Sequence, residues 1–361
     1  MGKIDLYLVR VIFLSTLSVF LVVFGIYFVI TFISNIKFGG YGDLGVLENI
    51  ELTLYSVPFS LNIIMPIIAM FGTLIGLSSL VQSGEMVAMR ASGVSWFSIS
   101  KPIFFLGVLF AICSFVVGSY ISPKLNMISM RKESLYKKGG GIYIGPQELW
   151  LKDKNNFFYI KEVGPGYHGV LNGINKYTIK NNKMISFLKA DKAILKDNNW
   201  ELFNVYSVKL NKNNFQKKRY AKLKLKTFIS LNIIKLLSDS SYLKDMTLYG
   251  IYLVINYRSS HGLNISKYQL EFWQIIFQPI SIIVLMFSIL PYIFMATSRT
   301  SYAFRMFVGS IVGFCFFVFN QFFSKVFIIY NLSIPAFLIA ALPCVVFSFV
   351  TFLIIKIKKN M

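Results

Sequence analysis

The sequence is poor in the residues on which most soluble enzymes depend. Only 14 % of its 361 residues are charged, and it contains two histidines and three cysteines. It lacks the G-x-x-x-x-G-K-[ST] motif that cradles ATP phosphates, the H-E-x-x-H motif of zinc proteases and the G-x-S-x-G turn of serine hydrolases. His168 and His261 are far apart in the chain, so we expect no metal site. These absences predict a protein with no cofactor and no catalytic site of its own.

The cysteines argue against disulfide crosslinks. They lie in long apolar runs without paired spacing, which is typical of small buried hydrophobic residues: Cys113, Cys315 and Cys344. The hydrophilic middle of the chain has no cysteine, so no disulfide crosslinks it.

Long apolar runs dominate the rest of the chain, in which 55 % of all residues are hydrophobic. Six runs are each long enough, at about 20 residues, for a helix to cross a bilayer core of about 30 Å: Val11–Ile33, Val57–Leu80, Pro102–Ile121, Phe272–Pro291, Met306–Ser324 and Ile334–Ile355. The first run is too long for a signal-peptide core, and no small-x-small cleavage site follows it. The cores of the runs contain no Asp or Glu, which argues against proton-coupled carriers and intramembrane aspartyl proteases.

The short segments between the runs differ in charge, which predicts the orientation. One set carries nine basic residues: Lys3, Arg10, Arg90, Lys101, Arg299, Arg305, Lys356, Lys358 and Lys359. The opposite set carries two, Lys37 and Lys325. Because short basic segments stay in the cytoplasm, we expect both termini inside and the hydrophilic block outside. In a Gram-negative cell, that compartment is the periplasm.

The hydrophilic block has the pattern of strands and turns. A hairpin is predicted from Leu149–Lys152, a turn at Asp153–Asn156 and a second strand at Phe157–Ile160. Asn tolerates the left-handed backbone of tight turns, which predicts further turns at Asn181-Asn182, Asp197–Asn199 and Asn211–Asn214. Strands are expected between them at Lys176–Lys180, Met184–Leu195 and Trp200–Leu210. The spacing predicts a compact antiparallel sandwich or jelly roll.

The block also holds most of the positive charge. Between Lys124 and Lys267 there are 26 Lys and Arg against nine Asp and Glu, so 17 of the net 22 positive charges lie there. No base-reading or stacking element accompanies them, so we expect no nucleic-acid partner. The charge fits an anionic lipid or glycolipid, or it reflects a composition biased toward Lys and Asn.

The second inside loop, residues 82–95, predicts a short amphipathic helix. Ser83 can cap this helix, Gly93 can end it, and Met86, Met89 and Arg90 recur at helical spacing. Such a helix suits either a groove on a cytoplasmic partner or the membrane surface, and the pattern favours neither.

Several motifs along the chain, taken in order and with their spacing, point to one family. They are Ser56-Val57-Pro58 at the start of the second span, the loop helix with Glu85 and its Ala91-Ser92-Gly93 end, the Leu149–Ile160 hairpin, Tyr268–Leu270, Trp273 and Phe277–Pro279. Together they resemble the LptF/LptG family of lipopolysaccharide-export permeases, and within it the LptG-type branch, over nearly the whole length. The resemblance implies an α-helical membrane protein with six transmembrane helices and an extracytoplasmic antiparallel β-jelly roll between helices 3 and 4. Helices 1–3 then occupy residues 1–122, the jelly roll 123–267 and helices 4–6 residues 268–361.

The resemblance implies a transporter subunit of the bacterial inner membrane rather than an enzyme. Such a subunit extracts lipopolysaccharide and passes it to a periplasmic bridge. The implied partners are an LptF-like permease subunit, two copies of the ATPase LptB, LptC, periplasmic LptA and lipopolysaccharide itself.

Three groups of residues would carry this function. The implied ATPase-coupling residues are Glu85, Met86, Met89, Arg90, Ser92 and Gly93. The implied substrate path along spans 1 and 5 contains Phe24, Phe28, Thr31, Lys37, Phe307 and Phe314, unless these spans are apolar because they face bulk lipid. The periplasmic bridge would use Trp150, Phe157 and Tyr159, which would form an apolar groove or the packed interior of the sandwich together with Phe187.

The chain also departs from the family pattern. LptG-type sequences often have a lysine where this chain has Thr31 and Phe59, while Lys37 is retained. Such lysines would pair with lipid A phosphates. Either the head group that is carried is simpler, or the partner subunit supplies the charge.

Two other functions match parts of the pattern. A mechanotransmission or scaffold subunit would share the coupling loop and the outer domain, but it needs fewer spans. A membrane glycolipid transferase would need a catalytic constellation in the outer domain, and none is recognisable. The number of spans therefore favours the permease.

Overall fold

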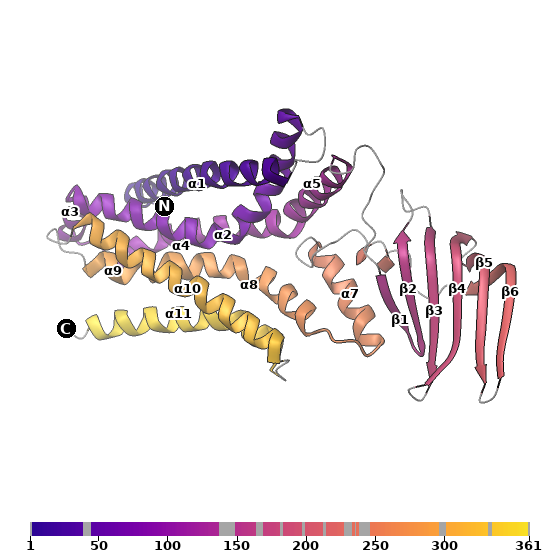
Figure 1. Cartoon of the computed structure of the whole chain (residues 1–361). Coiled ribbons are helices and arrows are strands. Elements are labelled where there is room, and N and C mark those ends of the chain that lie inside the picture. Colours follow the sequence, from indigo (N-terminus) through magenta and orange to yellow (C-terminus); the bar gives the residue numbers. More distant parts are fainter. Residues whose placement is uncertain are drawn as a thin grey trace. The chain divides into compact units, whose positions relative to one another are not determined.

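A computed structural model describes residues 2–38, 45–136, 149–163, 169–180, 183–196, 199–211, 214–226, 233–234, 236–237, 246–295, 301–330 and 334–359. These residues divide into two compact units (Figure 1). A helical unit combines Met1–Phe38, Val46–Asn126 and Ser266–Met361, and a sheet unit consists mainly of Met127–Ile265.

Among the residues that the structure describes, six helices are long and apolar enough to cross a membrane, which confirms the predicted spans. They are α1 (Lys3–Phe38), α2 (Val46–Gln82), α4 (Trp96–Val116), α8 (Ser266–Ser288), α10 (Tyr302–Tyr330) and α11 (Ala336–Lys359). α4 continues through the π-helical turn η1 (Val117–Ile121) into α5 (Ser122–Tyr136), and α8 is followed by α9 (Leu290–Met295). The short α3 (Glu85–Ala91) joins α2 to α4. The bounds differ from the predicted runs: α1 and α10 extend beyond their runs at both ends, whereas α8 ends at Ser288 and α11 begins only at Ala336.

Small residues set the packing of the helical unit around α2. A Cβ atom added at Gly72 would collide with the backbone of Thr16 in α1, so these two helices touch through a glycine. On α10, Cβ atoms added at Gly309 and Gly313 would collide with the side chains of Leu74 and Met70 of α2. Helices in a membrane are held together by such close approach, because lipid tails are as apolar as the side chains.

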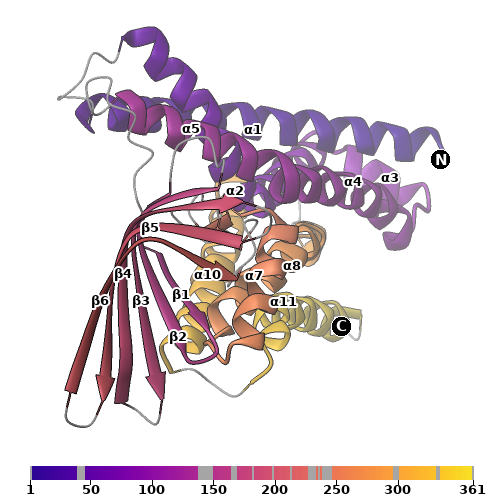
Figure 2. The ribbon, with the colours of Figure 1, turned by 90° about the vertical axis from the view of Figure 1, so that its right-hand side faces the viewer.

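The sheet unit contains one antiparallel sheet in the order β1-β2-β3-β4-β5-β6. Its strands are β1 (Leu149–Asp153), β2 (Asn156–Val163), β3 (Val170–Lys180), β4 (Lys183–Lys196), β5 (Asn199–Asn211) and β6 (Asn214–Lys226). Figure 2 shows that the strands bend along their length. The described strands form an up-and-down sheet, whereas a jelly roll has two sheets joined by Greek-key connections. The antiparallel sheet is therefore confirmed, and the jelly roll is not.

The predicted hairpin is confirmed in detail. Asp153 pairs with Asn156, and Lys154 between them has a left-handed backbone with φ 51°. Pairs that flank the other predicted turns, Lys196 with Asn199 and Asn211 with Asn214, place the chain reversals as expected. The residues between these pairs, and Asn181-Asn182, lie outside the described part of the chain. The sequence did not predict β6.

One face of the sheet packs into a hydrophobic core. The core contains Leu151, Phe158, Ile160, Leu171, Ile174, Trp200 and Leu202, together with Tyr257 of α7 (Leu248–Ser260). The Tyr257 hydroxyl donates to the Lys152 carbonyl at 2.9 Å and accepts from the Lys152 N–H at 3.0 Å. Both backbone groups lie on the outer edge of β1, so α7 closes that edge at Lys152. Burial raises the pKa of Tyr257 above its ordinary value.

Candidate functional site

The loop that was predicted to couple to an ATPase folds as expected, with one correction. α3 is preceded by Gly84 at φ 78° and followed by Gly93 at φ 86°, and both values belong to the left-handed region that favours glycine. Ser83 was predicted to cap the helix, but Gly84 occupies that position without a side-chain cap. The Ser83 hydroxyl donates instead to Leu80 and to Glu85. Gly93 ends the helix as predicted, and the Ser92 hydroxyl donates a hydrogen bond to the Met89 carbonyl at 2.9 Å.

α3 presents two different faces. Met86 is 3 % exposed and belongs to the core of the helical unit, and Met89 packs against that core. Val87 is 56 % exposed, and Ala88 and Arg90 are also exposed. The methionines therefore hold the helix to its own bundle, and a partner would meet the face of Val87 instead.

Glu85 is held in place from another helix. The Tyr7 hydroxyl in α1 donates to the Glu85 carboxylate at 2.7 Å, and Ser83 donates to its other oxygen at 3.0 Å. Tyr7 lies near the start of the chain. This contact places α3 and the beginning of α1 at the same end of the helical unit, as the charge-based orientation requires.

On α1, the predicted path residues form part of an aromatic row. Phe20, Phe24, Phe28 and Phe32 stack one above another, with ring centroids 6.1–6.4 Å apart. Phe24 and Phe28 pack against Val57, Leu61 and Ile68 of α2. Thr31 is half-buried, and the side chain of Lys37 lies outside the described part of the structure. These phenylalanines therefore contribute to the α1–α2 contact on at least one side.

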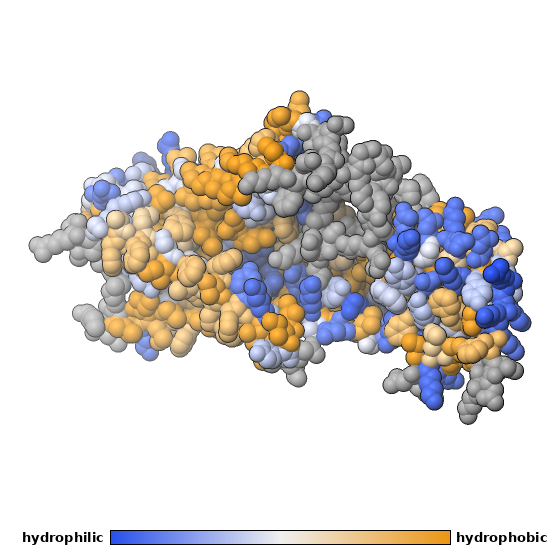
Figure 3. Space-filling view, in the orientation of Figure 1, coloured by the Kyte–Doolittle hydropathy of each residue, from blue (hydrophilic) through white to orange (hydrophobic). Residues whose placement is uncertain are grey.

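On α10, the predicted path residues face outward. Phe314 is 68 % exposed, whereas Phe316, two residues later, is 5 % exposed against Phe347. Phe307 and Phe314 belong to a stripe of exposed apolar side chains that recurs every three or four residues: Phe304, Phe307, Ile311, Phe314, Val318 and Phe322. Hydrophobic residues cover much of the surface of the helical unit (Figure 3), so exposure of the stripe alone does not separate a lipid path from bulk lipid.

A polar cluster inside the helical unit was not predicted from the sequence. Asn62 of α2 lies between Ser114 of α4 and Gln278 of α8. Ser114 donates to the Asn62 side chain at 2.7 Å, and Gln278 donates to the Asn62 backbone carbonyl. The sequence signal for this cluster was Pro66, which lies four residues after Asn62. A proline has no N–H, so it leaves the carbonyl four residues earlier without its helical hydrogen-bond donor.

The predicted bridge residues lie on one face of the sheet. Phe157 and Tyr159 alternate with the core residues Phe158 and Ile160, so their side chains point away from the core. Trp150, which is exposed, lies 5.1 Å from Tyr159 and 5.9 Å from Tyr177 between ring centroids. Tyr177 in turn lies 5.2 Å from Phe187. Trp150, Phe157 and Tyr159 thus belong to an outward aromatic row rather than to the packed core.

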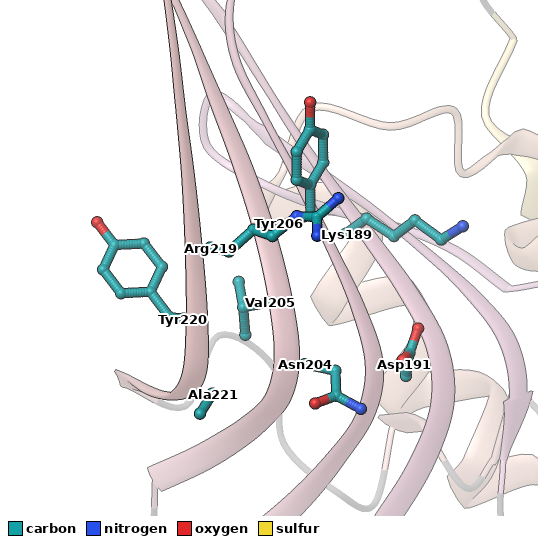
Figure 4. A pocket seen from close by; sticks show the side chains of 8 residues that line it. All are labelled: Lys189, Asp191, Asn204, Val205, Tyr206, Arg219, Tyr220 and Ala221. Carbon is teal, nitrogen blue, oxygen red and sulfur yellow. The ribbon is translucent and has the colours of Figure 1, made fainter.

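A hollow lies on the outer strands of the sheet. It has a volume of about 630 Å³ and is lined by Lys189, Asp191, Asn204, Val205, Tyr206, Arg219, Tyr220 and Ala221 (Figure 4). In the described part of the chain, no three His, Cys, Asp or Glu side chains are placed to hold a metal ion.

Six candidate spans and an inserted antiparallel sheet define a multi-pass membrane protein with one extramembrane unit. The chain matches, over residues 6–357, the family described as "Lipopolysaccharide export system permease LptF/LptG". It is 26 % identical to the lipopolysaccharide export system permease protein LptG of Escherichia coli K12. It is 24 % identical to the protein of the same name from Haemophilus influenzae, and each alignment covers 99 % of both chains. The chain therefore belongs to the LptF/LptG family of lipopolysaccharide-export permeases.

Proposed function

We propose that this chain is the LptG-type permease subunit of an ATP-driven exporter that extracts lipopolysaccharide from the inner membrane. The family match from residue 6 to residue 357 carries this proposal, because it spans both the membrane helices and the inserted sheet. The two relatives are named for the same export system and are matched end to end. In this proposal both termini lie in the cytoplasm and the sheet unit lies in the periplasm.

The proposed partners follow from the same export system. The chain pairs with an LptF-like permease subunit, and two copies of LptB hydrolyse ATP below the membrane. LptC and LptA receive the lipid on the periplasmic side, where Trp150, Phe157 and Tyr159 offer an aromatic surface. Lipopolysaccharide is the substrate, and the chain performs no chemistry on it.

ATPase coupling is proposed for the exposed face of α3. Val87 and Arg90 face outward, while Met86 anchors the helix in the core. Because Glu85 accepts a hydrogen bond from Tyr7 of α1, a movement of α3 is transmitted directly to α1. α1 is one of the two helices proposed to line the lipid path, so this contact links ATPase movement to that path.

The lipid path is proposed along α1 and the outward stripe of α10. A photo-crosslinking residue at Phe314 should capture lipopolysaccharide in the assembled complex, whereas the same residue at the buried Phe316 should capture none. Mass spectrometry of the purified complex should find bound lipopolysaccharide. A complex that carries only phospholipid, with equal crosslinking at both positions, would contradict the proposed function and favour a scaffold subunit.

A further inference from the structure

The sheet is interrupted along a line that crosses strands β2 to β6. One residue of each strand is missing from the pairing with its neighbours: Lys161, Gly173, Asp191, Asn204 and Ala221. Gly173 and Asn204 have left-handed backbones, with φ 64° and φ 52°. A non-glycine residue in this region is uncommon, and Asn is among the residue types that tolerate it best. We call this line the crease.

The crease changes which side chains face outward. Ala190 and Ala193 of β4 are both buried, as are Leu202 and Val205 of β5. In a regular strand, residues three apart point to opposite faces, so each strand has gained one outward residue at the crease. Asp191 and Asn204 are exposed there. The crease therefore adds a carboxylate and an amide to the outer face of the sheet.

The hollow forms next to these two groups. Lys189, Tyr206 and Arg219 are successive cross-strand partners on β4, β5 and β6, which brings their side chains side by side. In Figure 4, Asp191 and Asn204 lie on neighbouring strands, on the same side of this row. At about 630 Å³, the hollow is in the size range of small-molecule sites.

The two cations of the hollow have no acidic partner in the described part of the chain. Arg219 lies over the Tyr206 ring, with its guanidinium carbon 5.9 Å from the centroid. Neither Lys189 nor Arg219 has a described carboxylate within ion-pair distance. Elsewhere on β6, Lys222 and Lys224 lie 2.8 Å and 3.6 Å from the Glu201 carboxylate. No described ion pair therefore competes with an anionic ligand for Lys189 and Arg219.

We propose that the hollow binds a phosphorylated sugar. Lys189 and Arg219 would hold the phosphate, because an ammonium and a guanidinium both bind phosphate oxygens through charge-assisted hydrogen bonds. Asp191 accepts hydrogen bonds from sugar hydroxyls and disfavours a second phosphate beside it. Asn204 can donate to or accept from the same hydroxyls. This assignment rests on the proposed function, in which the ligand is the phosphorylated sugar of lipopolysaccharide.

The test uses the full-length chain in detergent and three probes: glucosamine 6-phosphate, glucosamine and inorganic phosphate. Titration calorimetry should show that glucosamine 6-phosphate binds at least tenfold more tightly than either of the other two. The double variant Lys189→Gln/Arg219→Gln should raise the Kd for glucosamine 6-phosphate at least tenfold. The matched variant Lys218→Gln/Lys226→Gln removes two charges from β6 outside the hollow and should change the Kd less than twofold.

Asn204→Gly keeps the left-handed backbone and removes only the amide side chain. This variant should leave the thermal unfolding midpoint unchanged. It should weaken the binding of glucosamine 6-phosphate more than the binding of inorganic phosphate. If inorganic phosphate binds as tightly as the sugar phosphate, the hollow is a simple anion site and the proposal is wrong. Equal loss of binding in the two double variants would also overturn it, because general charge would then explain the affinity.

The proposal and the proposed function can fail separately. If lipopolysaccharide copurifies with the assembled complex but glucosamine 6-phosphate does not bind, the hollow is not part of the substrate path. The proposed permease function is then unaffected. Absence of lipopolysaccharide from the complex removes the permease function, whatever the hollow binds.

Discussion

The side-chain amide of Gln278 in α8 donates a hydrogen bond to the backbone carbonyl of Asn62 in α2. Pro66 has no N–H, so this carbonyl lacks the donor that an α-helix would normally supply. Ser114 of α4 donates to the Asn62 side chain at 2.7 Å, which brings a third helix to the same point. A polar group without a hydrogen-bond partner in a membrane costs free energy. Gln278 therefore supplies the donor that Pro66 removes.

Gln278→Leu should therefore destabilise the helical unit by about 1 kcal/mol, the range of a hydrogen bond between membrane helices. Pro66→Ala restores an N–H, so the same Gln278→Leu change should cost less in that background. Thermal unfolding in detergent of the four proteins of this double-mutant cycle measures the difference. An equal cost with and without Pro66 would show that Gln278 serves another purpose.

Gly72→Ala should destabilise the contact between α1 and α2. The added methyl group meets the backbone of Thr16, which cannot rotate away, and such overpacking costs about 1–3 kcal/mol. Gly25→Ala is the matched control, because nothing lies within 4 Å of a Cβ atom at Gly25. The unfolding midpoint of Gly72→Ala should fall clearly below that of Gly25→Ala. Similar midpoints would contradict the close approach of these helices.

Val87→Asp and Met86→Asp separate docking from folding at α3. Val87 is exposed, so its variant should insert and unfold like the original chain but bind the LptB ATPase at least tenfold more weakly. Met86 is buried, so its variant should lower the unfolding midpoint, because an unpaired charge enters the core. Retention of full ATPase binding by Val87→Asp would exclude the proposed coupling face.

The stability of the sheet unit should fall in acid through Glu201. The hydrogen-bonded Lys222 ammonium lowers the pKa of Glu201 below its ordinary value of 4.5. The ionised carboxylate therefore stabilises the fold fully above pH 4.5, and this contribution is lost as the pH falls through the folded-state pKa. The difference in unfolding midpoint between the original chain and Glu201→Gln should shrink over that window. A difference that is constant below pH 4.5 would contradict the assignment.

The sequence was sufficient for the helices and hairpins because these follow from local patterns. Long apolar runs predicted all six spans, and the Asp153–Asn156 turn predicted the β1–β2 register. The two glycines that flank α3 also follow local rules, although Gly84 rather than Ser83 begins the helix. Such features need only the period of the apolar residues and the φ preferences of turn residues.

Features that depend on contacts between distant segments could not be predicted. Met86 and Val87 look equally apolar in sequence, and only tertiary packing decides which of them is buried. Asn62 and Gln278 are 216 residues apart, so Pro66 indicated an unpaired carbonyl but not its donor. The crease at Asn204 likewise needs the register of four neighbouring strands, and no local signal marks it.

The most direct test of the proposed function is transfer of lipopolysaccharide in reconstituted vesicles. Vesicles containing lipopolysaccharide, this chain, its LptF-like partner and LptB are mixed with LptC and LptA, and a photo-crosslinking residue in LptA reports the arrival of lipid. The account predicts lipopolysaccharide on LptA only when both ATP and this chain are present, with a strong decrease in the Val87→Asp variant. ATP hydrolysis at the normal rate without any lipopolysaccharide on LptA would contradict it, because the chain would then transmit movement without carrying lipid.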